Sequence, residues 1–86
     1  MATLIIDGAK VAASLDEALA AAGSEAEMTL DFSSVLRIDP AALHAIEELA
    51  AAADASSVKV TLQSVNVDVY KVLKLMHLAS RFSFGN

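Results

Sequence analysis

The chain has 86 residues, a formal net charge of −5 and no cysteine. An acidic surface repels phosphate backbones, so the charge argues against a nucleic-acid partner. Without cysteine, neither a disulfide framework nor a thiolate site can form. This length predicts one domain over residues 1–86. The lack of a signal-peptide pattern and of a membrane-length apolar run predicts a soluble, cytoplasmic protein that does not insert into membranes.

The first third of the chain predicts a strand and a short helix. Residues 3–7 form an apolar run of strand type. Ser14 is followed three positions later by Glu17, which is the spacing of a capping box. We therefore expect Ser14 to cap a helix over residues 15–22 that ends at Gly23.

The next stretch predicts a half-buried strand followed by a longer helix. Apolar and polar side chains alternate over residues 28–33, which is the period of a strand with one buried face. Asp39 is a strong N-cap, because its carboxylate accepts backbone N–H groups of the first turn. Pro40 suits the first helical position, where its missing N–H costs nothing. We expect the helix to begin at Pro40 and to continue to about Ala53.

The last third repeats this order. Residues 58–63 alternate as a strand does, Asn66 is the expected cap of a third helix, and residues 82–84 predict a short edge strand. Apolar residues of these elements are expected to form one core. They are Leu30, Phe32, Leu43, Ile46, Leu49, Val60, Leu62, Leu73 and Met76.

The alternation of strands and helices predicts an α/β fold with parallel strands and right-handed crossovers. The second face of the two central strands would carry only polar side chains, Thr29, Asp31, Lys59, Thr61 and Gln63. A sheet covered on both faces has strands that are apolar on both sides. We therefore expect two layers: a mostly parallel or mixed sheet of four or five strands, with about three helices mainly on one face.

The strand–loop–helix junction also resembles a known family. Leu30-Asp31-Phe32-Ser33, then Val35, then Ile38-Asp39 opening a helix with Leu43 is similar to the core motif of STAS domains. These domains include bacterial anti-sigma-factor antagonists and the cytoplasmic tails of sulfate transporters. The resemblance extends over residues 4–84 and implies the two-layer fold and a protein-binding role in signal transduction and transcription regulation.

The helix start departs from the pattern of the regulated antagonists. Their helix usually opens Asp-Ser-Ser-Gly-Leu or Asp-Thr-Ser-Gly-Leu, and the partner kinase phosphorylates the second hydroxyl residue. Here residues 39–43 are Asp-Pro-Ala-Ala-Leu, so Ala41 takes the phosphoacceptor position and offers no nucleophile. The resemblance implies that the partner is bound around this helix start, by Ser34, Arg37, Asp39, Pro40, Ala41, Ala42 and His44.

Two alternatives stay open beside an antagonist-like domain bound to an anti-sigma factor or kinase-like protein. The first keeps the fold and makes the chain a cytoplasmic subunit bound to a lipid-transport ATPase. The second is a phosphotransfer protein that uses His44 or Ser34. No catalytic arrangement with defensible spacing is present, so we expect no enzyme. The histidines are far apart in sequence, which predicts no metal, and nothing implies a cofactor.

The third helix has more apolar residues than one buried stripe needs. Val72, Leu75 and Leu78 exceed that stripe, and Tyr70 and Lys74 are expected to be exposed. Extra apolar positions on an accessible helix indicate either a docking face or a helix wrapped more deeply by a small domain. We expect a monomer or a weak dimer.

Overall fold

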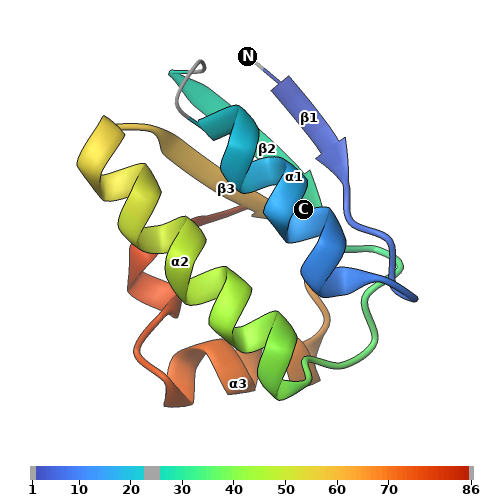
Figure 1. The fold of residues 1–86 in the computed structure, drawn as a ribbon. Coiled ribbons are helices and arrows are strands. Elements are labelled where there is room, and N and C mark those ends of the chain that lie inside the picture. The colour runs from blue at the N-terminus through green and yellow to red at the C-terminus, as the bar shows by residue number, and fades with distance from the viewer. Residues whose placement is uncertain (1, 23–25, 86) are drawn as a thin grey trace.

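The computed structural model describes residues 2–22 and 26–85, in which four strands alternate with three helices (Figure 1). The elements are β1 (Ala2–Ile5), α1 (Val11–Ala22), β2 (Glu27–Asp31), α2 (Pro40–Ser56), β3 (Lys59–Gln63), α3 (Val67–Leu75) and β4 (Ser83–Gly85), with a 3-10 helix, η1 (Ala79–Arg81), before β4. Strands and helices therefore follow one another as the sequence predicts.

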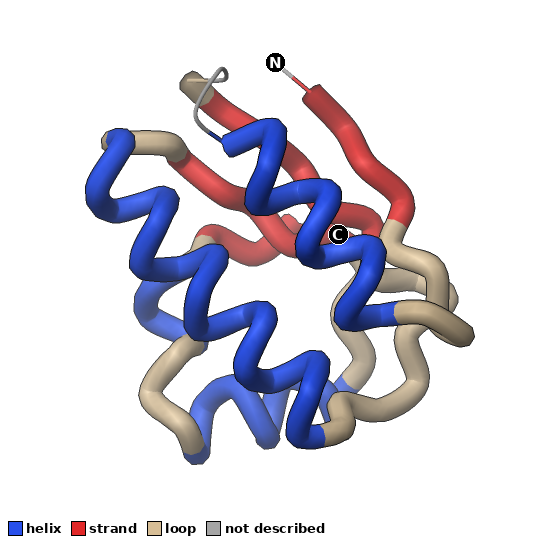
Figure 2. The backbone as a smooth tube through the Cα atoms, viewed as in Figure 1, coloured by secondary structure: helices blue, strands red, loops and turns tan. Residues whose placement is uncertain are grey.

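The four strands form one sheet in the order β1-β2-β3-β4, and every neighbouring pair is parallel. Because spatial order follows chain order, right-handed crossovers place the connecting helices on the same face. Figure 2 shows α1 and α2 in front of the strands, with α3 below them. The predicted two-layer architecture is confirmed, and its sheet has four parallel strands.

The helix-covered face of the sheet holds the core. Met28 and Leu30 of β2 and Val60 and Leu62 of β3 are all buried. They pack in one cluster with buried residues of the helices, such as Leu49 of α2. Fully burying an aliphatic side chain of this size contributes about 1.5–3 kcal/mol. This cluster is thus the main source of stability.

The opposite face of the sheet is mainly polar, although the exposed Ile5 of β1 also lies on it. The register of the strands places four polar residues side by side on this face: Thr3, Thr29, Thr61 and Ser83. None of these four residues is buried, whereas the apolar residues that alternate with them in β2 and β3 are buried. A second helical layer would need an apolar surface here. The predicted wet face is therefore confirmed.

The start of α1 differs from the prediction. The helix begins at Val11, and the N–H of Ser14 already donates to the Lys10 carbonyl as in a helical turn. The Ser14 hydroxyl instead accepts a hydrogen bond from the N–H of Asp7 at 3.1 Å. Ser14 is thus inside the helix and binds the preceding loop, so the capping-box prediction was wrong. Gly23, its predicted end, lies outside the described residues.

The end of α3 also differs from the prediction. Asn66 caps the helix as expected, but α3 ends at Leu75, and Met76 is 47% exposed rather than in the core. His77 has a left-handed backbone with φ of 59°, and the N–H of Leu78 donates to the Leu73 carbonyl at 2.8 Å. This is a Schellman ending with Met76 as the C-cap, and Leu78, which follows the turn, is buried instead of Met76. Of the other predicted core residues, Leu43 is half-buried and the rest are buried.

Candidate functional site

Three loops meet at the carboxyl edge of the parallel sheet, where α2 also begins (Figure 1). They follow β1, β2 and β3. Most of the residues predicted to bind a partner lie in the second loop or in the first turns of α2. We call the exposed residues here the helix-start surface: Ser34, Leu36, Arg37, Asp39, Pro40, Ala41 and His44.

The loop between β2 and α2 is held in place by a side chain from the start of α3. Asn66 donates hydrogen bonds from Nδ2 to the carbonyls of Val35 and Leu36, at 3.1 and 3.2 Å. Its Oδ1 accepts from the N–H of Val69 at 2.8 Å and so caps α3. An amide side chain offers two N–H donors and an acceptor oxygen, whereas a Ser or Thr hydroxyl offers one donor and an ionised Asp offers none. Asn66 therefore joins the loop to α3.

Neighbouring residues of this loop have opposite environments. The side chain of Val35 is only 1% exposed and anchors the loop in the core, whereas that of Leu36 is 74% exposed. Leu36 is not among the residues predicted from the sequence to bind a partner, although an apolar residue next to the anchored Val35 was a visible signal. The helix-start surface thus contains one large apolar side chain, Leu36, that is exposed to solvent.

The end of β2 makes its own turn. The carboxylate of Asp31 accepts a hydrogen bond from the N–H of Ser33 at 2.8 Å. The backbone N–H of Ser33 and then its hydroxyl stabilise the charged form, which lowers the pKa of Asp31 below its ordinary value. The N–H of Val35 donates to the Phe32 carbonyl at 2.9 Å. These bonds form a tight turn of the kind in which Asp and Ser are common.

The loop after β1 lies directly against the loop after β2. A Cβ added to Gly8 would lie 1.9 Å from the carbonyl oxygen of Ser34. No larger residue fits without moving one of the two loops. Between them is a shallow hollow of about 480 Å³, beside the helix-start surface. It is lined by Asp7, Gly8, Ala9, Ser34, Leu36 and Arg37.

The first turn of α2 follows the sequence prediction. Asp39 has extended backbone angles, and its Oδ1 accepts the N–H of Ala42 at 2.7 Å. Pro40 occupies the first helical position and Ala41 the second, where it is exposed. The Asp39 cap is therefore confirmed. The side chain of Ala42 is 1% exposed and faces the interior, so it lies outside the helix-start surface.

His44 lies one turn into α2 and contacts an acidic neighbour. Its Nε2 is 2.7 Å from Oε1 of Glu48, one turn further along the helix, and both side chains are at least half exposed. An exposed pair at this spacing contributes a few tenths of a kcal/mol when charged. His44 is thus an accessible surface residue.

The described part of the chain contains no cluster of three His, Cys, Asp or Glu side chains that could hold a metal ion. Within residues 3–22 and 26–85, no polar or charged side chain is buried. None of the helices there has the length and apolarity needed to cross a bilayer. The chemical character of the site is that of an exposed, partly apolar surface.

Comparison with known proteins agrees with this architecture. The fold is similar to the crystal structure of a Thermotoga maritima protein described as an anti-sigma factor antagonist, with a TM-score of 0.70 and 24% sequence identity over 99% of this chain and 73% of that one. A search of curated proteins gave no match. The family model of the STAS domain matches residues 6–86. Nearly the whole chain is covered, and the chain therefore belongs to the STAS domain family.

Proposed function

We propose that this STAS domain is a non-catalytic protein-binding module whose helix-start surface contacts its partner. The observation that carries the proposal is the exposure of Leu36 in a loop that Asn66 and Val35 hold in place. An exposed leucine adds little to folding. Its burial by a partner contributes about 1.5–3 kcal/mol, and a preorganised loop loses little entropy on binding.

The chemistry of the described side chains supports binding rather than catalysis. General acids and bases usually owe their shifted pKa values to burial or to close charge partners. Here the carboxylate of Asp39 caps α2. The turn after β2 favours the charged form of Asp31. His44 contacts Glu48 on the exposed surface of α2. These groups have structural or surface roles, which is why we expect no enzymatic activity.

Ala41 supports constitutive binding. It is exposed at the second position of α2, where the regulated antagonists have the hydroxyl that their kinase phosphorylates. Pro40 has no N–H, and the Asp39 carboxylate already accepts the N–H of Ala42. Alanine has no hydroxyl that could receive a phosphoryl group, and the missing N–H of Pro40 removes one donor that a phosphate at this helix start could use. We infer that partner binding here is not controlled by phosphorylation at position 41.

The expected partner is an anti-sigma factor or kinase-like protein, as for the antagonists that this domain resembles. The alternative partner is the ATPase of a lipid transporter. Both would bind through the helix-start surface, so only the identity of the bound protein separates them. A phosphotransfer role of His44 or Ser34 is the remaining alternative, because both side chains are exposed.

Affinity capture tests the proposal. The immobilised domain would be compared with Ala41→Ser, Ala41→Glu and, as a matched control, Ala51→Glu at an exposed position further along α2. We expect one protein to be recovered with the parent, the serine variant and the control, and to be lost with Ala41→Glu. Its sequence then distinguishes a kinase-like partner from a transporter ATPase.

Equal recovery with Ala41→Glu and Ala51→Glu would contradict the proposed surface. The phosphotransfer alternative has its own measurement, the intact mass of the domain after incubation with the recovered partner and a phosphate donor. A mass increase of one phosphoryl group that His44→Ala or Ser34→Ala abolishes would replace the binding role with phosphotransfer.

A further inference from the structure

A second exposed surface lies at the C-terminal end of the fold, between α3, η1 and β4. Three hollows of about 560, 360 and 300 Å³ follow one another there. The first two share Lys74 and His77, and the last two share Tyr70 and Phe84. We call this continuous depression the α3 groove. Its main lining residues are Val67, Tyr70, Lys71, Lys74, Leu75 and Phe84.

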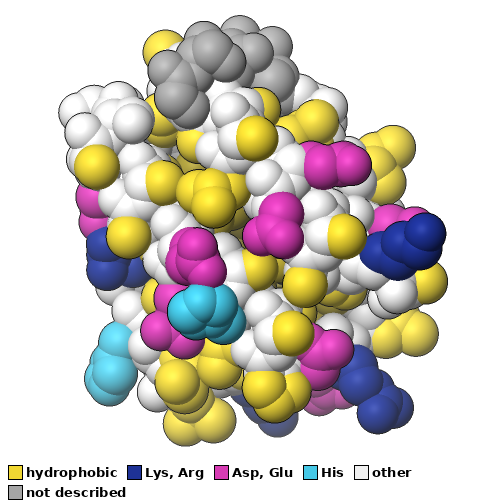
Figure 3. All heavy atoms as spheres, viewed as in Figure 1, with side chains coloured by type: hydrophobic (Ala, Val, Ile, Leu, Met, Phe, Trp, Pro, Cys, Tyr) yellow, Lys and Arg dark blue, Asp and Glu magenta, His cyan; other side chains and the backbone are white. Residues whose placement is uncertain are grey.

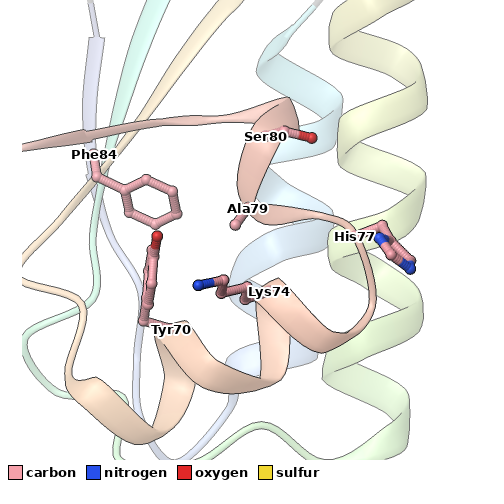
Figure 4. A pocket seen from close by; sticks show the side chains of 6 residues that line it. All are labelled: Tyr70, Lys74, His77, Ala79, Ser80 and Phe84. Atoms are coloured by element: carbon pink, nitrogen blue, oxygen red, sulfur yellow. The ribbon is translucent and has the colours of Figure 1, made fainter.

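The groove has an ordered aromatic wall. The ring centroids of Tyr70 and Phe84 are 5.1 Å apart, and the rings meet edge to face at 77°. Figure 4 shows these side chains pointing toward each other from α3 and β4, with Lys74 projecting into the space beside them. Edge-to-face pairs of this kind hold both rings in one arrangement. The wall is therefore present before anything binds.

Large apolar side chains are exposed along the groove. Val67 at one end of α3 and Leu75 at the other are 68% and 78% exposed, and Tyr70 and Phe84 remain partly accessible. An apolar surface of several side chains, rimmed by charges, is typical of an interaction site on a small domain. None of these residues belongs to the helix-start surface.

The charge of the groove is opposite to that of the rest of the chain. Residues 65–86 contain three basic residues and one acidic residue, a net charge of +2, whereas residues 1–64 contain three basic and ten acidic residues, a net charge of −7. Arg81 is paired with Asp54. Lys71 and Lys74 line the groove and form no ion pair among the described residues. The groove thus offers two available positive charges beside apolar walls.

From this complementarity we infer that the α3 groove binds an acidic amphipathic helix of a partner protein. Apolar side chains of that helix would pack on Tyr70, Phe84 and Leu75, and its carboxylates would pair with Lys71 and Lys74. Since α3 has nine residues and is therefore about 13 Å long, the groove accommodates two to three turns of helix. A flat anionic membrane fits less well, because the surface is hollowed and the whole chain is acidic.

A peptide titration followed by amide NMR tests the inference. The probe is a synthetic helix of about 14 residues with leucine at helical spacing on one face and glutamate elsewhere. We expect saturable shifts in residues 65–85, weakened by added salt. A peptide with lysine in place of glutamate, and one with serine in place of leucine, should bind at least tenfold more weakly.

Variants of the domain locate the binding. Lys71→Glu with Lys74→Glu, and separately Tyr70→Ala, should each reduce the affinity for the acidic peptide at least tenfold. The control is the double variant Lys10→Glu with Lys59→Glu, which makes the same charge change away from the groove. It should reduce the affinity for the acidic peptide less than threefold. Circular dichroism verifies that every variant is folded.

Four results would overturn the inference: no saturable binding of the acidic peptide, equal binding of the lysine peptide, equal losses in the control pair, or shifts confined to the helix-start surface. Sedimentation with phosphatidylglycerol vesicles in the absence of peptide binding would assign the groove to a membrane instead. Because Ala41→Glu should not alter peptide binding, this test can fail independently of the proposed function.

Discussion

The helix-start surface and the α3 groove are built in different ways. The first is a loop and a helix end held by hydrogen bonds to the backbone, from Asn66 to Val35 and Leu36 and from Asp39 to Ala42. The second is formed by side chains of α3 and β4, with the Tyr70–Phe84 contact at its centre (Figure 4). Substitutions that loosen the first surface should therefore also lower stability, whereas charge changes in the second can alter binding alone.

The two surfaces also differ in electrostatics. Figure 3 shows one face of the molecule, on which acidic side chains spread over the helices and basic ones lie mainly toward the rim. Lys71 and Lys74 give the groove local positive charge, whereas the helix-start surface contains both a basic residue, Arg37, and an acidic one, Asp39. The same small domain therefore presents two surfaces of different chemistry.

The largest stability effect is expected at Asn66. Asn66→Ala removes the cap of α3 and leaves two loop carbonyls without their donor, so it should lower the free energy of unfolding by about 2–3 kcal/mol. Asn66→Asp keeps the cap and removes only the donors, and it should cost about half as much. Urea unfolding measures both. An unchanged midpoint for Asn66→Asp would show that the link to the β2–α2 loop contributes nothing, whereas equal losses in the two variants would show that the cap contributes nothing.

The next effect is expected at Asp39. Asp39→Ala should destabilise the domain by about 0.5–2 kcal/mol, because the N–H of Ala42 loses its acceptor. The same urea experiment applies, with Ala41→Glu as the comparison. A carboxylate in the first turn interacts favourably with the helix dipole, so Ala41→Glu should leave stability unchanged or raise it by up to about 1 kcal/mol. An unchanged midpoint for Asp39→Ala would contradict the capping role.

A stabilising effect is expected at the end of α3, beside the groove. His77 and Ser57 both have left-handed backbones at helix ends, with φ of 59° and 55°. A side chain in this region costs roughly 1–2 kcal/mol, and part of that cost returns as chain entropy when glycine replaces it. His77→Gly and Ser57→Gly should each raise the free energy of unfolding by about 0.5–1 kcal/mol in urea melts. Destabilisation of His77→Gly alone would show that the imidazole contributes contacts of its own.

The smallest expected effect is on the stability of the domain at acidic pH. The pKa of Asp31 is lowered in the folded state, chiefly by the Ser33 N–H. Its contribution to stability is therefore present above its unfolded pKa of about 3.9 and is lost as the pH falls through the lower folded value. Urea midpoints between about pH 5 and pH 2.5 should fall less steeply for Asp31→Asn than for the parent. A parallel decline of the two curves would show that the turn does not favour the charged carboxylate.

Short sequence patterns predicted the starts of α2 and α3 and the buried faces of the central strands. The Asp39-Pro40 start of α2, the cap at Asn66 and the alternating faces of β2 and β3 each depend on residues within a few positions, so the sequence alone suffices for them. The resemblance at residues 30–43 also indicated the family that the matched model shows. Six of the seven residues predicted to bind a partner are exposed, and their binding role stays a prediction.

Long-range contacts account for what was missed. The bond from Asn66 to Val35 spans 31 positions, and no local pattern predicts it. The capping prediction failed at Ser14 because its hydroxyl binds the N–H of Asp7, seven residues earlier. Met76 was predicted to be in the core because helical spacing was continued past Leu75, but Met76 is the C-cap and the chain turns at His77, which buries Leu78 instead.

The central claim is that the helix-start surface binds the partner without a phosphorylation switch at Ala41. Titration calorimetry with the recovered partner tests it most directly, on the parent, Ala41→Ser, Ala41→Glu and the Ala51→Glu control. We predict unchanged affinity for Ala41→Ser and Ala51→Glu, and a loss of at least about tenfold for Ala41→Glu, which is roughly 1.4 kcal/mol. Binding of Ala41→Glu as tight as that of the parent would contradict the account and move the partner's contact to another surface.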